Sequence, residues 1–227
     1  MSKRRAVPFT YPYPRPSVAC DVIVFTLRSD DLSVLLIRRK KAPFKGKWAL
    51  PGGFVDENES LHHAAARELQ EETGITTNRL EQLGAYGDPG RDPRGHTVSV
   101  AWLTFLPTEP RITAGDDAAS AEWHSFRNLA LDGKPSPKKV ELAFDHAKIL
   151  AHAYGRLVQH LEHPSRDRPF ELLPSRFTLA QLRHVYEAIL GKALLPRAFK
   201  KRVVDGGLVV PATSTKTAAA LYRWRTK

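Results

Sequence analysis

The chain has 227 residues, of which 42% are hydrophobic, so it can form one large or two small packed domains and is not globally disordered. Its 35 Lys and Arg residues outnumber 24 Asp and Glu residues, and the net charge of +11 favours a polyanionic partner such as nucleic acid. The single cysteine, Cys20, excludes an internal disulfide and predicts a cytoplasmic protein, and the absence of a long apolar run predicts no membrane contact.

The first part of the chain predicts an arm followed by a hairpin. Residues 1–16 are basic and rich in Pro and Tyr, which favours an extended arm because proline fixes φ and removes a hydrogen-bond donor. Two β-rich apolar runs follow at 18–27 and 33–39, and the RSDD sequence between them is typical of a hairpin turn.

Three side chains near the end of this hairpin are candidates for ligand contact. Arg38 and Arg39 either end a solvated strand, or one of them points into a site and pairs with a phosphate in a bidentate way. Trp48 either stacks on a nucleobase or packs against the core.

The stretch GGFVDENESLHHAAARELQEETGI at 52–75 reads as a glycine turn, an acidic loop, one helix and a stop. Glu59 and Ser60 are the candidate N-caps, since either side chain can accept a hydrogen bond from the first turn. The run at 61–73 consists mainly of good helix formers, and Gly74 suits the left-handed position that ends a helix.

This predicted helix carries three carboxylates on one stripe, because Glu68, Glu71 and Glu72 are spaced at i, i+3 and i+4. Like charges so placed repel each other and weaken an isolated helix. A hard divalent cation reverses that cost, since Mg²⁺ takes oxygen ligands and combines carboxylates with substrate phosphates. The pattern is therefore either a solvated acidic face or a metal site.

The spacing around these carboxylates resembles the Nudix box at every defined position. Gly53 is followed after five residues by Glu59 and after seven more by the sequence RELQEETGI at 67–75. The resemblance implies an α/β/α Nudix sandwich with a mixed sheet. It also implies metal-dependent hydrolysis of a nucleoside diphosphate linked to another group, with Glu59 as the outlying acidic member of the site.

The same resemblance assigns roles to the other residues of the box. It implies that Glu68, Glu71 and Glu72 hold Mg²⁺, with Mn²⁺ as an alternative, and that the carbonyl group of Gly52 adds a ligand. Arg67 stands where an arginine supports the carboxylates. Such a metal polarises phosphoryl oxygens and activates water for attack on phosphorus. A general base is expected either from these glutamates or from Asp116 or Asp117, which equally suit a capping turn.

A loop at 87–96 interrupts two β-rich runs at 80–86 and 97–106. Its prolines and glycines predict a rigid turn system that exposes backbone groups. Its sequence resembles the GDPxRDPRGH segment of Nudix proteins that recognise ADP-ribose, which makes ADP-ribose the expected ligand. The residues expected to contact it are Arg38, Arg39, Trp48, Gly53, Asp88, Arg91, Asp92 and His96.

A long helix is predicted after this part of the chain. Ser136 suits the N-cap and Pro137 the first helical position, and apolar residues then recur at helical spacing to about His160. Asp145 and His146 lie within this pattern, either as a catalytic or metal-binding pair or as a capped interaction of the core. The composition of 163–174 is typical of a linker.

The C-terminal piece, at 175–227, predicts a winged helix-turn-helix. Thr178 caps one helix, Pro196 opens a second, basic helix, and two short β-runs follow at 208–210 and 220–224. Such a fold lays its second helix in the major groove of DNA. The residues expected to contact DNA are Arg197, Lys200, Lys201, Arg202 and Lys216.

Over nearly its whole length the chain resembles the Nudix-related transcriptional regulators of NAD metabolism, the NrtR type. The resemblance implies an extended arm (1–16), a Nudix domain (17–162), a linker (163–174) and a DNA-binding domain (175–227). It further implies a homodimer that binds a palindromic DNA operator as a repressor and is released by ADP-ribose. Many members have a decayed Nudix box, whereas this one is intact, which favours hydrolysis as well as sensing. The alternative is an ADP-ribose or related pyrophosphatase whose C-terminal domain serves dimerisation or substrate closure.

Overall fold

A twelve-residue strand, β1 (Ser17–Arg28), lies at the centre of a mixed seven-stranded sheet. It pairs antiparallel with β2 (Asp31–Arg39) and parallel with β6 (Thr97–Phe105), which in turn pairs antiparallel with β5 (Glu81–Tyr86). Three further strands complete the sheet, namely β3 (Trp48–Ala49), β4 (Gly52–Phe54) and β7 (Ala118–Ser125). The computed structural model describes residues 11–28, 30–107, 109–113, 118–131, 139–162, 172–212 and 220–225.

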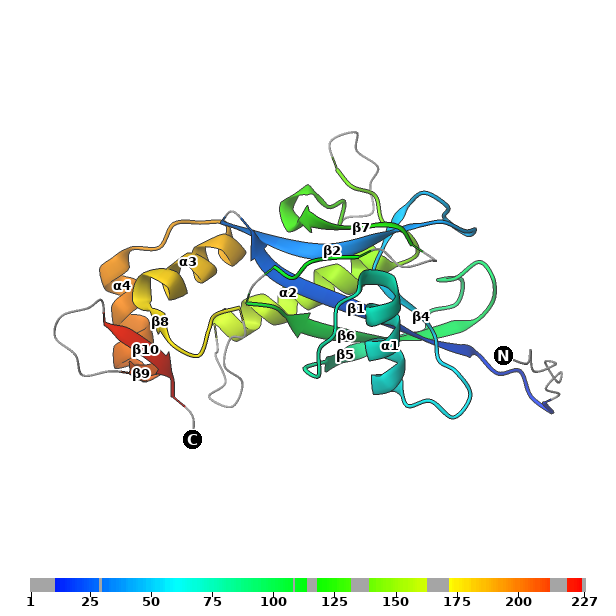
Figure 1. Ribbon diagram of the computed structural model, residues 1–227, viewed down its shortest axis with the longest axis horizontal. Coiled ribbons are helices and arrows are strands. Elements are labelled where there is room, and N and C mark those ends of the chain that lie inside the picture. Colours follow the sequence, from blue (N-terminus) through cyan, green and yellow to red (C-terminus); the bar gives the residue numbers. More distant parts are fainter. Residues whose placement is uncertain are drawn as a thin grey trace.

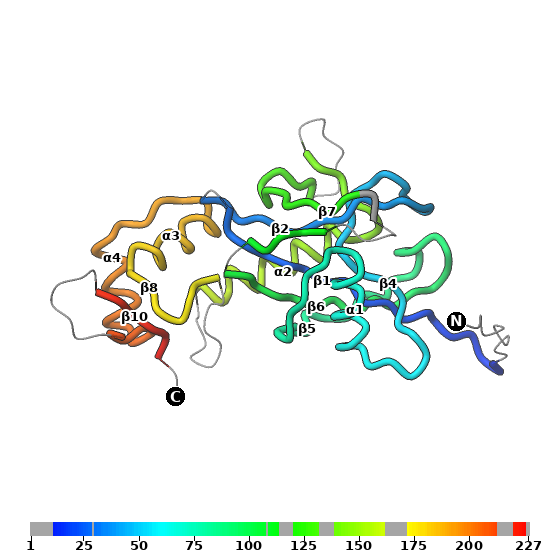
Figure 2. Tube along the Cα trace, viewed as in Figure 1, coloured from blue at the N-terminus to red at the C-terminus, as the bar shows by residue number. Residues whose placement is uncertain are grey.

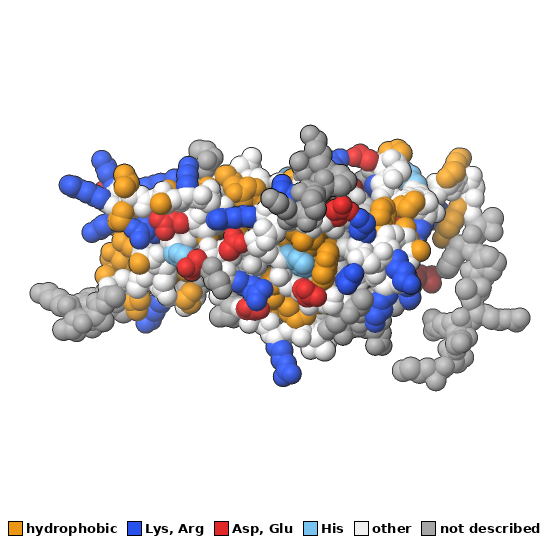
Figure 3. Space-filling model, turned by 90° about the horizontal axis from the view of Figure 1, so that it is seen from above, with side chains coloured by type: hydrophobic (Ala, Val, Ile, Leu, Met, Phe, Trp, Pro, Cys, Tyr) orange, Lys and Arg blue, Asp and Glu red, His pale blue; other side chains and the backbone are white. Residues whose placement is uncertain are grey.

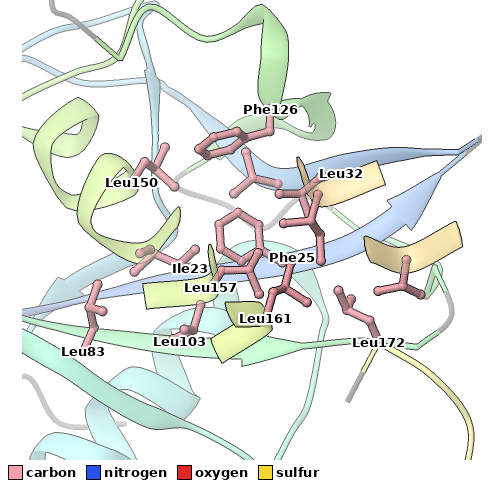
Figure 4. Packing of buried hydrophobic residues seen from close by; sticks show 14 of the residues in the cluster. Ile23, Phe25, Leu32, Leu83, Leu103, Phe126, Leu150, Leu157, Leu161 and Leu172 are labelled. Atoms are coloured by element: carbon pink, nitrogen blue, oxygen red, sulfur yellow. The ribbon is translucent and has the colours of Figure 1, made fainter. Parts of the chain in front are cut away.

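Helices cover both faces of this sheet, which confirms the predicted α/β/α sandwich (Figure 1). Because side chains alternate along β1, Val22 and Val24 pack with the helix α1 (Leu61–Thr73) on one face, and Ile23 and Phe25 pack on the other. The second face is covered by α2 (His146–Glu162), whose Leu150, Leu157 and Leu161 lie around Phe25 (Figure 4).

The helix α1 has the ends that its sequence predicts. Of the two candidate caps, Ser60 is the one used, and its Oγ accepts a hydrogen bond from the backbone of His63 at 3.3 Å. Gly74 ends the helix with φ at +73°, a value that glycine adopts without steric cost.

The helix predicted from Ser136 to about His160 is confirmed from His146 onward and is wrong over the described residues before it. Val140 and Leu142 form isolated bridges with Leu129 and Trp48, so their backbone groups serve extended pairings instead of helical ones. The helix α2 starts only at His146, two residues after Phe144, whose φ is +52°. Ser136 and Pro137 themselves lie outside the described residues, as do the candidate bases Asp116 and Asp117.

The C-terminal part has the order of elements of a winged helix, as predicted. The strand β8 (Phe177–Thr178) precedes α3 (Leu179–Leu190), which Thr178 and Gln181 cap reciprocally. The next helix, α4 (Pro196–Lys200), continues as a π-helical turn, η2 (Lys201–Asp205). The strands β9 (Val209–Pro211) and β10 (Leu221–Trp224) form with β8 a small sheet of order β8-β10-β9.

The winged helix lies at one end of the molecule, beyond the large sheet (Figure 2). One hydrophobic cluster contains Leu157 of α2 together with Tyr186 of α3 and Phe199 of α4, so apolar packing continues from the sheet into the winged helix. The hydroxyl group of Tyr154 in α2 donates a hydrogen bond of 2.8 Å to the carbonyl group of Ile189 in α3. None of the described helices is long and apolar enough to cross a membrane.

Candidate active site and nucleic-acid interface

The carboxylate of Glu72 is buried beside the glycine turn that precedes α1. Its Oε2 accepts a hydrogen bond of 2.8 Å from the backbone N–H of Gly52. Burial raises the pKa of Glu72 to about 8, and the nearby Glu68 carboxylate contributes to that rise. Burial also raises the pKa of Glu68.

Two glycines allow close packing of the turn, Gly53 against a carboxylate of α1 and Gly52 against the backbone of β1. A Cβ atom on Gly53 would stand 2.4 Å from Oε1 of Glu68, and one on Gly52 would stand 2.1 Å from the carbonyl oxygen of Cys20. Gly52 also has φ at +156°, so both its conformation and its surroundings exclude a side chain. The spacing of the box therefore places backbone groups of β4 against side chains of α1.

Arg67 connects three acidic residues of the box. Its guanidinium group donates to Glu59 at 2.9 Å, to Glu68 at 2.7 Å and to Glu71 at 3.3 Å. The hydrogen bonds from Arg67 lower the pKa of Glu59 to about 2. Glu71 is the most exposed of the three, with 60% of its side chain accessible to solvent.

This arrangement suits a divalent cation, although the described carboxylates, histidines and cysteines do not close around a common point. Glu68 and Glu71 both accept hydrogen bonds from Arg67, whereas Glu72 accepts one from the backbone of Gly52. Burial raises the pKa of both Glu68 and Glu72, and the charge of Glu68 raises that of Glu72 further, so added positive charge is favourable here. The residues present therefore fit a hard cation with oxygen ligands.

A pocket opens next to these carboxylates. Its lining residues are Ala19, Asp21, Arg39, Leu50, Gly52, Gly53, Phe54, Arg91, Asp92, Arg94, Thr97, Phe144 and His146. Four of the eight residues predicted to contact a ligand line this pocket, namely Arg39, Gly53, Arg91 and Asp92.

The other four predicted ligand residues do not line it. Arg38 is exposed and donates to the carbonyl group of Gly46 at 3.1 Å. The indole ring of Trp48 lies edge-on to the ring of His124, with 4.2 Å between centroids. The remaining two are Asp88, which pairs with Lys148 at 2.5 Å, and His96, whose Nε2 is 3.1 Å from the carbonyl oxygen of Gly87.

The floor of the pocket is a buried network of charged groups from three distant parts of the chain. Arg91 makes two hydrogen bonds to the carboxylate of Asp145, at 3.0 and 2.6 Å, and lies 3.6 Å from Asp21. His146 accepts a hydrogen bond of 2.9 Å from the backbone of Leu50 through Nδ1, and its Nε2 is 3.4 Å from Asp21. Burial lowers the pKa of His146, which favours the neutral ring.

Several residues of the pocket were not predicted from the sequence, among them Asp21, Arg94 and Phe144. Asp21 carried a signal, because it is the one acidic residue in the apolar run at 18–27. Arg94 stands in the loop that was expected to bind a ligand, but its side chain was not singled out. Phe144 stands in the run for which the sequence predicts a helix, but α2 begins two residues after it, at His146. The structure also brings Asp145 and His146 into this site, where they do more than fill the core.

A second candidate surface lies on the winged helix. Arg197, Lys200 and Lys201 of α4 and η2 are exposed, whereas Phe199 and Val203 of the same elements are buried. Lys and Arg side chains gather at this end of the molecule (Figure 3). Arg202 is also exposed, but its Nη2 donates to the backbone of α2. Lys216 lies outside the described residues.

Comparison with known proteins bears on both surfaces. Residues 18–149 match the family model of the NUDIX domain, and residues 169–224 match that of the NrtR DNA-binding winged helix domain. The ADPR responsive transcriptional repressor NtrR of Acinetobacter baylyi is 35% identical over 93% of this chain and 83% of its own length. The ADP-ribose pyrophosphatase of Methanocaldococcus jannaschii is 44% identical over 61% of this chain and 73% of its own.

The fold comparison covers both domains together. The crystal structure of Shewanella oneidensis NrtR complexed with a 27mer DNA superposes with a TM-score of 0.66 at 30% identity, over 92% of this chain and 93% of that one. The chain therefore belongs to the NrtR-type family of Nudix-related transcriptional regulators.

Proposed function

We propose that this protein is a repressor that binds DNA through its winged helix, senses ADP-ribose in its Nudix domain and hydrolyses ADP-ribose to AMP and ribose 5-phosphate. The observation that carries this proposal is the presence of a complete Nudix box in the same chain as an exposed basic helix of a winged helix domain. A relative along nearly the whole chain responds to ADP-ribose, and a relative of the Nudix part is an ADP-ribose pyrophosphatase.

Nudix hydrolases use divalent metal ions, and we propose Mg²⁺ here, held by Glu68, Glu71, Glu72 and the carbonyl group of Gly52. When bound, the ion supplies polarisation of the phosphoryl oxygens and an activated water molecule. Arg67 holds the carboxylates in place through its hydrogen bonds to Glu68 and Glu71. The proposed ligand contacts are those predicted from the sequence, namely Arg38, Arg39, Trp48, Gly53, Asp88, Arg91, Asp92 and His96. Arg39 and Arg91 are best supported, because both line the pocket.

DNA would be bound by α4 and its continuation η2 in the major groove. Arg197, Lys200 and Lys201 would contact phosphates or base edges, since all three are exposed on one basic element. A homodimer would place two such helices roughly 34–36 Å apart, on the same face of a palindromic operator. ADP-ribose releases DNA only if it binds the DNA-incompetent arrangement more tightly.

The test follows labelled operator DNA by fluorescence anisotropy after one addition of ADP-ribose with Mg²⁺. The wild type should release DNA and then rebind it as the ligand is hydrolysed. Glu72→Gln should release DNA and stay released for longer, because the ligand persists. AMP and ribose 5-phosphate should release DNA poorly.

Two outcomes would reject parts of the proposal. If neither salt titration nor operator selection reveals DNA binding, the protein is a pyrophosphatase whose C-terminal domain has another role. If the wild type consumes ADP-ribose but regains DNA binding at the same rate as Glu72→Gln, hydrolysis of the ligand does not restore repression. A panel of nucleoside diphosphate derivatives, read by phosphate release after coupling to a phosphatase, identifies the preferred substrate.

A further inference from the structure

Two arginines of the pocket share one aromatic ring. Cζ of Arg39, at the end of β2, is 4.7 Å from the ring centroid of Phe144, and Cζ of Arg94 is 5.6 Å from the same centroid. Arg94 also lies 4.9 Å from the ring centroid of Phe54. Cation–π contact therefore holds two positive charges at one wall of the pocket, although they come from sequence positions 55 residues apart.

The positive charge at this wall is not fully balanced. Arg94 pairs with Asp92 at 2.7 Å. Arg39 donates to the carbonyl group of Pro43 at 2.8 Å, and within the described ranges it makes no ion pair. Burial lowers the pKa of Arg39 and repulsion from Arg94 lowers it further, and the net shift stays downward although Glu72, Asp92 and Asp21 each oppose it. An anion entering the pocket would relieve that repulsion.

The ring that organises the two arginines is held in a strained backbone conformation. Phe144 has φ at +52°, in the left-handed region that a bulky residue rarely adopts. Such a conformation tends to persist at functional positions. The backbone N–H of Ala143 donates to Trp48 at 2.7 Å, and the ring of Phe44 meets that of Phe144 edge-on at 4.8 Å. These contacts fix the ring at the pocket wall.

We propose that Arg39 and Arg94, aligned by Phe144, each bind one phosphate of a diphosphate, and that they select nucleoside diphosphate derivatives over monophosphates. A guanidinium group presents a planar fork of donors that matches two oxygens of one phosphate. Nε and Nη2 of Arg94 donate to Asp92, and Nε of Arg39 donates to Pro43, so the Nη1 and Nη2 end of each group is the part that would meet a phosphate. A single phosphate can satisfy one such end, whereas two linked phosphates can satisfy both. Gly52 lines the same pocket, so a diphosphate on the arginines would lie next to the carboxylates of α1.

This inference rests on the proposed function, because it takes the ligand to be a nucleoside diphosphate derivative. The inference adds Arg94 and Phe144 to the binding residues. It also assigns phosphate binding to Arg39 instead of its neighbour Arg38 in β2. Arg38 and Arg39 are adjacent in a strand, so their side chains point to opposite faces, and only Arg39 lines the pocket.

The test measures the binding of two probes, ADP and AMP, to the full-length protein by isothermal titration calorimetry. In the double variant Arg39→Gln/Arg94→Gln, ADP loses two charge-assisted contacts and AMP at most one. The ratio of ADP affinity to AMP affinity should therefore fall by at least about tenfold, the effect of one such hydrogen bond. Phe144→Leu should lower the same ratio by a smaller factor, because both charges remain but lose their alignment.

The matched control is Lys45→Gln/Arg111→Gln, which removes two charges from exposed positions outside the pocket lining and should leave the ratio unchanged. Thermal unfolding checks that each variant is folded, and Arg39→Lys/Arg94→Lys, which keeps the charges but not the forks, replaces the glutamine variant if that one does not fold. Equal losses for ADP and AMP, or an equal effect of the control, would overturn the inference. The proposed function fails separately, if wild type neither hydrolyses ADP-ribose nor changes its DNA binding when ADP-ribose is added.

Discussion

Arg202 of the π-helical turn η2 donates a hydrogen bond of 2.7 Å from Nη2 to the backbone carbonyl group of Leu161, in the last turn of α2. The other end of α2 lies in the pocket, because His146 is its first residue and Asp145 before it binds Arg91. A helix of this length spans roughly 25 Å, so one rigid element contacts both the candidate ligand site and the basic turn of the winged helix.

This relationship predicts that Arg202 carries part of the coupling between ligand and DNA. Coupling between two sites typically amounts to 1–3 kcal/mol, or about 5–150-fold in affinity. In Arg202→Gln, the factor by which ADP-ribose weakens operator binding should be at least about threefold smaller than in wild type, because the end of α2 is no longer bound to η2. Anisotropy titrations of operator DNA with and without ADP-ribose measure that factor.

Lys201→Gln is the control for Arg202→Gln. It removes the same charge from the neighbouring exposed position. It should weaken DNA binding but leave the effect of ADP-ribose unchanged. An unaltered ADP-ribose effect in Arg202→Gln would show that the signal does not pass through this contact.

Glu72→Gln should lower kcat for ADP-ribose by at least about a hundredfold, the upper range for groups that merely support a metal site. The physical reason is the loss of a buried carboxylate next to Gly52 that would carry its charge when the metal is bound. Steady-state assays with Mg²⁺ measure the change. Glu57→Gln, an exposed acid of the preceding loop, should have normal turnover. A folded Glu72→Gln protein with wild-type turnover would disprove the metal assignment.

Lys200→Ala and Lys201→Ala should each weaken DNA binding on every sequence alike, because contacts with phosphates carry no sequence information. Each lost phosphate contact should reduce the slope of log affinity against log salt by about one. Gel shifts at several salt concentrations measure the slope, with Lys45→Ala, exposed in the Nudix part, as the control. Full DNA affinity after deletion of residues 175–227 would contradict the assignment of DNA binding to the winged helix.

Histidine burial predicts how stability depends on pH. The pKa of His146 is lowered below 6.5 in the folded protein, so below that pH the unfolded chain binds one more proton than the folded one. The contribution of the neutral His146 to the free energy of unfolding should therefore be complete above about pH 6.5. It should decrease as the pH falls below that value, by at most about 1.4 kcal/mol per pH unit.

His146→Asn should remove this part of the pH dependence, while its side-chain oxygen can still accept the hydrogen bond from Leu50. Urea unfolding between pH 5 and pH 8 measures the free energy of unfolding. His160→Asn, in the last turn of the same helix, is the control for removing a histidine. An unchanged acid slope in His146→Asn would assign the loss of stability to other groups.

The sequence alone determined those helices and caps whose defining residues lie within a few positions of one another. The spacing of Glu68, Glu71 and Glu72, the cap at Ser60 and the left-handed Gly74 are properties of a single helix, so they could be predicted without knowledge of the fold. The same holds for the capping box of α3 and for the order of elements in the winged helix. Composition also indicated a polyanionic partner, because net charge needs no structure to be counted.

The tertiary structure decided which side chains meet. Asp21, Arg91 and His146 come from β1, a loop and α2, and only the pairing of distant strands and the packing of α2 bring them together. The start of α2 was also a tertiary outcome, since pairing of Leu142 with Trp48 competes successfully with helical propensity. Only the position of the sheet shows that Arg39 lines the pocket and Arg38 does not. Only the position of α2 shows that Arg202 donates a hydrogen bond to its last turn.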